Sequence, residues 1–182
     1  MLELGFSWLR GWREVILYPA AFRVHRRHHD EDSGVVTEWP DELAGEAWEQ
    51  GPLILSWEDL EADLADPFAG YDLVAHEIAH KLDLLDGVAD GTPPLPRGIA
   101  LAEWVAAMQP AYEGLVRAVE RGAEPAIDSY AAEGPDEFFA VVSEYFFSAP
   151  ARLAEAMPGV HALLTRFYRP SRSLSSGAAA RR

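Results

Sequence analysis

Short apolar runs in the first third of the chain predict β-strands. Each run is rich in β-branched or aromatic residues and lies next to proline or glycine: REVILYP (Arg13 to Pro19), GVVTEW (Gly34 to Trp39) and PLILSW (Pro52 to Trp57). The polar stretch RVHRRHHDEDSG (Arg23 to Gly34) separates the first two runs and is typical of a loop. We therefore expect a small sheet near the start of the chain.

From Ser56 onward the apolar positions recur at helical spacing. Ser56 can cap a helix that ends before Asp66, and the segment from Tyr71 to Leu85 predicts a second helix that stops near Gly87. Further helices are expected at Ile99 to Arg121 with a kink or break at Pro110, at Asp136 to Ser148, at Ala151 to Met157 and at Val160 to Tyr168, with a Pro/Gly-rich loop from Val88 to Gly98.

Strands followed by helices predict an α+β fold with a small mixed sheet and a helical remainder. Residues 1–170 are expected to form a single domain, and residues 171–182 a disordered tail.

Charge and composition narrow the classes of partner. The 182 residues carry a formal net charge of -15 and no cysteine. Nucleic acids and anionic membrane surfaces repel so acidic a chain, so we expect neither as a partner. Without cysteine, any metal must be held by histidine and carboxylate side chains.

Targeting signals are not apparent in the sequence. The segment MLELGFSWLRGW has no basic leader, long apolar core or small-residue cleavage site. No later run approaches the roughly 20 apolar residues of a membrane span. The sequence therefore predicts a cytoplasmic protein.

The second predicted helix carries the motif HEIAH. His76 and His80 stand four residues apart, on one face of a helix, so both imidazoles can bind one ion. Zn²⁺ suits such a pair, and a catalytic zinc commonly has three protein ligands and one water. Glu77, beside the first histidine, can then act as general base toward a metal-activated water.

So short a motif can arise by chance, and a catalytic zinc needs a third protein ligand. The helix DEFFAVVSEYFF offers Glu137 and Glu144 in an apolar setting, where a carboxylate needs a partner. The two stand seven residues, or about 10 Å, apart along a helix, so only one of them is expected to bind the ion directly. Spacing alone does not choose between them, and Asp136 and His161 are weaker candidates.

Several stretches resemble the Mlc titration factor A peptidases, zinc-dependent enzymes of the gluzincin type. In the order of that family, they are GWREVILYPAAF (Gly11 to Phe22), GEAWEQGPLILSW (Gly45 to Trp57), VAHEIAHKLD (Val74 to Asp83), IDSYAA (Ile127 to Ala132) and EFFAVVSEYFFSAP (Glu137 to Pro150). The resemblance implies a zincin-like domain that hydrolyses peptide bonds with aminopeptidase-like activity.

The resemblance also implies roles for individual residues. His76, His80 and Glu137 would be the zinc ligands and Glu77 the general base. Tyr130 would donate to the developing oxyanion, with a packed core tyrosine as the alternative. Glu144 would then fix a ligand histidine or a neighbouring backbone group.

Asp83 shares the helix face of the two histidines and would either orient an imidazole or cap and solvate the helix end. The strand PLILSW (Pro52 to Trp57) is expected at a sheet edge, where a peptide substrate can add. Family members usually begin with a further helical region, so a shortened N-terminus is expected here. As an alternative function, the chain would use its zinc scaffold to bind a transcription repressor of the Mlc type.

Overall fold

The computed structural model describes residues 4–5, 8, 14–29, 36–43, 45–47 and 51–169. Within them the fold is α+β, as the sequence predicts, with strands first and helices after. The elements are β1 (Val15–Tyr18), β2 (Phe22–His29), β3 (Val36–Leu43), β4 (Gly45–Ala47), β5 (Leu53–Ser56), α1 (Trp57–Ala65), α2 (Leu73–Asp83), η3 (Leu84–Asp86), α3 (Leu101–Glu120), η4 (Ser129–Ala132), α4 (Pro135–Ser148), α5 (Pro150–Ala156) and α6 (Pro158–Tyr168). The predicted tail, residues 171–182, lies outside this part of the chain.

A small mixed sheet has the strand order β1-β5-β4. β1 runs parallel to β5, and β4 runs antiparallel to it. All four residues of β5 are buried, which is typical of a strand covered on both faces, whereas all four of β1 are exposed. The expectation that PLILSW forms a sheet edge is therefore wrong: β5 is central, and β4 is the edge strand that contacts α2.

The predicted loop from Arg23 to Gly34 is also wrong over the residues that the structure describes. Residues up to His29 belong to β2, which pairs antiparallel with β3 from Phe22 opposite Leu43 to His29 opposite Val36. The polar composition of this segment gives no strand signal, because the strand depends on backbone pairing with β3.

Local sequence explains where the helices begin. Ser56 caps α1 by accepting the N–H of Asp59, and Asp72 caps α2 by accepting the N–H of Ala75. Proline opens α4, α5 and α6, at a position where its missing N–H costs no hydrogen bond. α2 therefore begins at Leu73 rather than at Tyr71, and α3 runs through Pro110 without a break.

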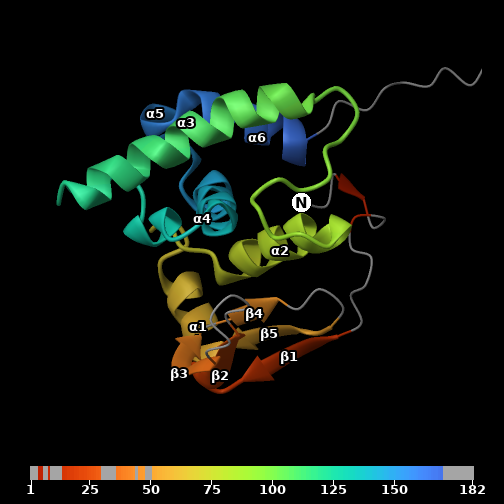
Figure 1. Cartoon of the computed structure of the whole chain (residues 1–182), viewed down its shortest axis with the longest axis vertical. Helices are drawn as coiled ribbons and strands as arrows, with labels where there is room; N and C mark the ends of the chain where they lie inside the picture. The colour runs from red at the N-terminus through yellow and green to blue at the C-terminus, as the bar shows by residue number, and fades with distance from the viewer. Residues whose placement is uncertain are drawn as a thin grey trace, which may run out of the picture.

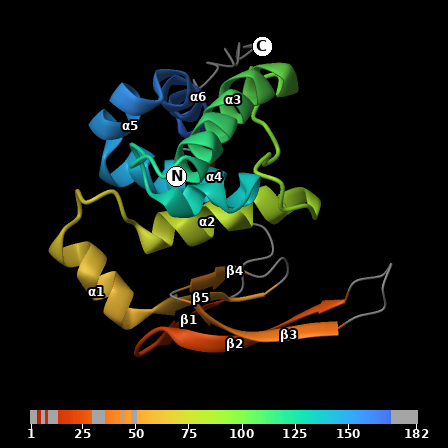
Figure 2. The same cartoon turned by 60° about the vertical axis from the view of Figure 1, so that its left-hand side comes forward.

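The helices build up in layers on one side of the sheet. Figures 1 and 2 show α2 between the sheet and α4, with α3 and α6 farther from the sheet. α2 is thus the layer at which the strands and the helical part meet. None of the helices in the described ranges is long and apolar enough to cross a membrane.

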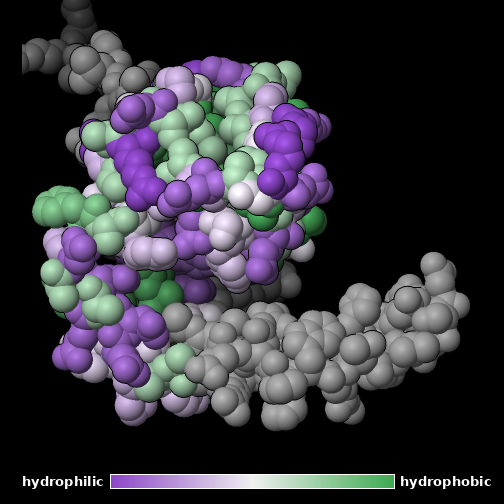
Figure 3. All heavy atoms as spheres, turned by 90° about the vertical axis from the view of Figure 1, so that its left-hand side faces the viewer, coloured by the Kyte–Doolittle hydropathy of each residue, from purple (hydrophilic) through white to green (hydrophobic). Residues whose placement is uncertain are grey.

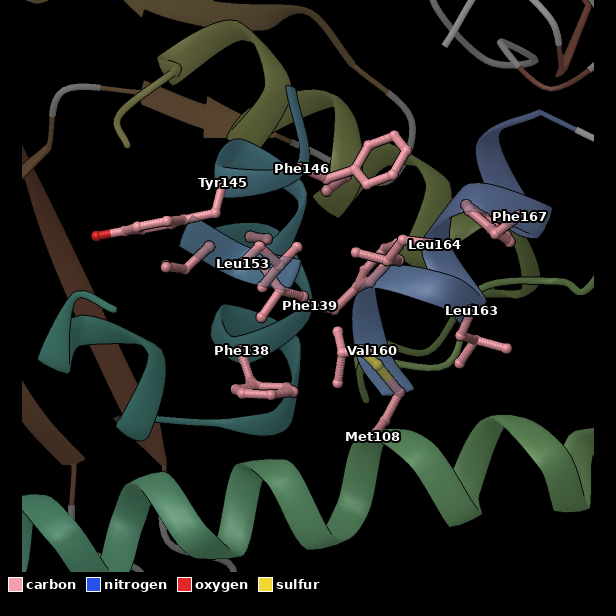
Figure 4. Close-up of a cluster of buried hydrophobic side chains, with 14 of the residues drawn as sticks. Met108, Phe138, Phe139, Tyr145, Phe146, Leu153, Val160, Leu163, Leu164 and Phe167 are labelled. Atoms are coloured by element: carbon pink, nitrogen blue, oxygen red, sulfur yellow. The ribbon is translucent and has the colours of Figure 1, made fainter. Parts of the chain in front are cut away.

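Helix α4 is the centre of the hydrophobic core. Ten of its 14 residues are buried, which is typical of a helix enclosed on most sides. Figure 4 shows Phe138, Phe139 and Phe146 from α4 beside Leu164 and Phe167 from α6, with α3 below them. Phe139 is fully buried, so its replacement by alanine would destabilise the fold by about 3–5 kcal/mol.

Candidate metal centre

Helix α2 presents two histidines on one face. His76 and His80 stand one turn apart, and their Nε2 atoms lie 3.0 Å from each other. The rings meet edge to face, with centroids 4.7 Å apart. Both side chains are largely buried, so the two nitrogens point to one enclosed place.

The first turn of α4 brings a carboxylate to the same place. Oε2 of Glu137 lies 3.3 Å from Nε2 of His76 and 3.4 Å from Nε2 of His80. Ligands about 2.1 Å from a shared ion stand about 3.0–3.4 Å apart in octahedral or tetrahedral geometry. Oε2 of Glu137 is buried and makes no hydrogen bond, so the three atoms fit a metal ion.

Glu144, two turns farther along α4, holds the other side of His76. Its Oε1 lies 2.7 Å from Nδ1 of His76, and its Oε2 accepts the N–H of Asp72 at 2.9 Å. A proton on Nδ1 leaves Nε2 as the lone-pair nitrogen, which is the form that binds a metal. Glu144 therefore contacts both a histidine of the site and the cap of the helix that carries it.

Buried negative charge surrounds the imidazoles. Burial alone would lower the pKa of His76, but the carboxylates of Glu137 and Glu144 outweigh it and raise the pKa to about 10 in the metal-free protein. Burial likewise favours the protonated form of Glu137, yet the two histidines hold its pKa well below the ordinary value. Burial keeps the pKa of Glu144 above its ordinary value, in spite of His76. The buried carboxylates therefore favour a positive charge at this site.

Glu77 lies beside this group and is only 4% exposed. The backbone of Gly45 in β4 approaches it so closely that a Cβ there would stand 2.6 Å from Cδ of Glu77. Lys81, one turn along α2, donates to the carbonyl of Gly51 just ahead of β5. The edge of the sheet and the helix are thus fixed together next to the Glu77 carboxylate.

A pocket of about 340 Å³ opens next to His76 and Glu77. Its wall comes from β4, from α1, from α2 and the residues just ahead of it, from η4 and the residue just ahead of it, and from α4. The lining residues are Gly45, Asp59, Asp63, Gly70, Tyr71, Leu73, His76, Glu77, Asp128, Tyr130, Val141, Glu144 and Tyr145. Figure 3 views the molecule from the side on which α1 lies, where hydrophilic and hydrophobic residues are mixed on the surface. The size is that of a small-molecule or short-peptide site.

Tyr130 stands at the mouth of this pocket. It is 42% exposed, and its ring centroid lies 6.1 Å from that of His76. A packed core tyrosine is therefore wrong for this position. Asp128 accepts the N–H of Tyr130 and the hydroxyl of Tyr71, both at 2.8 Å, and so fixes η4 against the segment ahead of α2.

Asp83 is fully buried at the end of α2, so it does not solvate the helix end. Its Oδ2 accepts the N–H of Gly91 at 2.8 Å instead of contacting an imidazole, and its Oδ1 is buried without a hydrogen bond. The side chain links α2 to the loop from Val88 to Gly98.

Comparison with known sequences places the chain in a family. The profile of the glucose-regulated metallo-peptidase M90 family matches residues 1–169. The chain belongs to the M90 metallopeptidase family.

Individual relatives agree with this M90 assignment. The chain is 44% identical to the Mlc titration factor A of Edwardsiella ictaluri and 42% identical to those of Serratia proteamaculans and Yersinia pestis. Each match covers 93% of this chain and 62–64% of the relative. The resemblance to Mlc titration factor A is confirmed, and the chain spans slightly less than two thirds of the length of these relatives.

An M90 metallopeptidase requires a metal. Among the residues that the structure describes, His76, His80 and Glu137 form the group of His, Asp and Glu side chains that could hold one. The sequence predicted these three residues from one helical motif and a resemblance.

Sequence reasoning missed the three aspartates of the pocket wall, Asp59, Asp63 and Asp128. Asp59 and Asp63 stand four residues apart on α1 and so share a face, but that spacing is common on solvated helices. Asp128, two residues before Tyr130, carried the clearest signal, since an aspartate there can cap the turn that follows.

Proposed function

We propose that this protein is a zinc-dependent metallopeptidase of the gluzincin type, with aminopeptidase-like activity on short peptides. One observation carries the proposal: the Nε2 atoms of His76 and His80 and the Oε2 atom of Glu137 converge within 3.4 Å of one another, with Glu77 buried beside them. We further propose a zincin-like domain over residues 1–170 that works in the cytoplasm.

His76, His80 and Glu137 would hold the metal. The donor set of two imidazoles and one carboxylate is that of catalytic zinc sites, and it leaves room for water or substrate. A zinc ion bound there would polarise the substrate carbonyl and lower the pKa of water toward neutrality. Glu144 keeps His76 in the tautomer that presents Nε2.

Glu77 is proposed as the general base. It lines the pocket next to His76, where it would take the proton of the attacking water and pass it to the leaving amine. Tyr130 lines the same pocket, with its ring centroid 6.1 Å from that of His76, and its hydroxyl would donate to the oxygen on which negative charge develops.

The charge of the pocket supports cleavage next to a free amino terminus. Among the residues that the structure describes, its wall includes Asp59, Asp63 and Asp128 and no lysine or arginine. An ammonium group is stabilised in such surroundings, whereas a substrate carboxylate is repelled. A peptide would therefore enter with its amino terminus in the pocket and its first peptide bond near His76 and Glu77.

The test combines metal analysis with kinetics. The purified protein should contain zinc, lose activity when chelated and regain it with Zn²⁺. The variant Glu77→Gln keeps the shape of the side chain, so it should retain zinc while kcat falls about 100- to 10,000-fold. A Glu77→Gln variant with zinc and full activity would rule out the general-base role.

A separate pair of substrates tests whether cleavage requires a free amino terminus. Matched aminoacyl and N-acetyl-aminoacyl chromogenic substrates differ only at the amino terminus, which is a free ammonium group in one and a neutral acetamide in the other. We expect the free-amine substrates to be cleaved and their acetylated partners to lose most of kcat/KM. Equal cleavage of both would assign endopeptidase activity instead.

A second function is proposed on the relatives' names, which refer to Mlc. The chain would bind a transcription repressor of the Mlc type, and Glu77→Gln separates this reading from the enzyme. A purely binding protein would cleave none of the panel and would bind the repressor equally well with and without the Glu77 carboxylate.

A further inference from the structure

The metal ligands come from two helices that are distant in the sequence. His76 and His80 lie in α2, whereas Glu137 is the third residue of α4. Metal binding tolerates errors in ligand position of only about 0.2 Å. The separation between α2 and the first turn of α4 therefore decides whether Glu137 reaches the ion.

Gly91 lies between these two helices and is held on both sides of its backbone. Its N–H donates to Oδ2 of Asp83, the last residue of α2, at 2.8 Å. Its carbonyl accepts the indole N–H of Trp104 in α3 at 3.1 Å. Both hydrogen bonds are buried, so the backbone of Gly91 has a fixed place relative to α2 and α3.

The Cα of Gly91 rests against the start of α4. A Cβ there would stand 2.7 Å from the carbonyl carbon of Pro135, and still closer to its oxygen, where an ordinary contact begins at 3.4 Å. Pro135 is the first residue of α4, two residues ahead of Glu137. Gly91 also has φ +76°, a conformation that favours glycine.

We propose that Gly91, held by Asp83, is a positioning residue for the third metal ligand. It sets the distance between the end of α2 and the first turn of α4, and so places Glu137 against the two histidines. A side chain at position 91 would push Pro135 away by on the order of 1 Å, which exceeds what a ligand carboxylate tolerates. This inference rests on the proposed metal ligands.

The chain offers a matched control. Gly98 lies at the end of the same loop and has φ +98°, but a Cβ there would meet nothing within 4 Å. Gly98→Ala therefore introduces the strain of a positive φ without the contact to α4. The difference between Gly91→Ala and Gly98→Ala isolates the effect of that contact.

The experiment measures Zn²⁺ affinity by competition with a chelating dye, and thermal unfolding of each variant with chelator and with Zn²⁺. Gly91→Ala should bind Zn²⁺ about 10- to 100-fold more weakly than wild type, a loss typical of residues that support metal ligands. Gly98→Ala should stay within about threefold. The rise in Tm on adding Zn²⁺ should shrink for Gly91→Ala alone. Equal Zn²⁺ affinities of the two variants would overturn the inference.

A double mutant identifies the ligand through which Gly91 acts. In a Glu137→Ala background, Gly91→Ala should cause no further loss of Zn²⁺ affinity, because the ligand that it positions is gone. Losses that multiply would mean that Gly91 acts through the histidines of α2, and the inference would fail. If wild type itself binds no metal, the proposed function fails instead.

Asp83 provides a second route if Gly91→Ala does not fold. Asp83→Asn keeps an oxygen for the N–H of Gly91, whereas Asp83→Ala removes it. Asp83→Ala should therefore weaken Zn²⁺ binding about tenfold or more, and Asp83→Asn should stay near wild type. An equal loss in both would assign the effect to the charge of Asp83 near His80 and overturn the role of the hydrogen bond.

Discussion

Replacing Asp83 with asparagine should change how the stability of the protein depends on pH. Asp83 is fully buried. Burial raises the pKa of its carboxyl from 3.8 to about 6; the N–H of Gly91 and the charge of His80 oppose this rise, and Asp90 and Asp136 add to it. The folded protein thus holds the proton of Asp83 more tightly than the unfolded chain does.

The sign of the effect follows from this order of the two pKa values. A carboxyl whose pKa is higher in the folded state contributes its stability below the unfolded value, and the contribution is lost as the pH rises through the folded value. A shift from 3.8 to about 6 corresponds to about 3 kcal/mol in all. When the pH rises from about 5 to about 8, the contribution of Asp83 to the free energy of unfolding falls by about 1.4 kcal/mol.

Chemical denaturation in the presence of a chelator measures this loss. The free energy of unfolding is determined for wild type and Asp83→Asn at both pH values. Asparagine does not titrate, so wild type should lose about 1.4 kcal/mol relative to the variant from the lower to the higher pH. Any pH-independent cost of the asparagine amide cancels in this comparison. A difference that stays constant, or that changes in the opposite direction, would refute the buried, raised pKa.

Three further substitutions test the neighbours of the metal. Glu144→Gln should weaken Zn²⁺ binding about 10- to 100-fold while the N–H of Asp72 keeps an acceptor, and unchanged affinity in a dye competition would contradict the contact with His76. Gly45→Ala should displace the Glu77 carboxylate and lower kcat with little change in zinc content, whereas Gly114→Ala, where a Cβ meets nothing nearer than 4.0 Å, serves as its control. Tyr130→Phe should lower kcat about 100-fold or more with KM nearly unchanged, and a change confined to KM would make Tyr130 a binding residue.

Local periodicity predicted the parts of the site that lie within one helix. His76 and His80 share a face because four residues make about one helical turn, so the sequence sufficed for that pair. Strands β1 and β5 and the cap of α1 at Ser56 are likewise local signals. β2 was missed because its strand state depends on pairing with β3, which its own composition does not reveal.

The contacts that join α2 to β4 and to the loop from Val88 to Gly98 were beyond sequence reasoning. The order β1-β5-β4 places β4 at the edge beside Glu77, and only pairing between strands decides that order. The link from Asp83 through Gly91 to Pro135 spans more than 50 positions of the chain. The sequence offered two roles for Asp83, and the structure shows a third.

The different roles proposed for the two carboxylates of α4 agree with their different positions along the helix. Glu137 lies in the first turn of α4, where the free N–H groups and the helix dipole favour a negative charge. Burial raises its pKa, but the two histidines outweigh burial and hold the pKa below the ordinary value. Glu144 lies in the interior of the helix, where burial raises its pKa and favours a shared proton. Seven residues separate them, and the two turns bring one to Nε2 and the other to Nδ1 of the same His76. An anion suits the metal side of an imidazole, and a strong hydrogen-bond acceptor suits the opposite side. Helix position therefore supports the proposed ligand role of Glu137 and the proposed orienting role of Glu144.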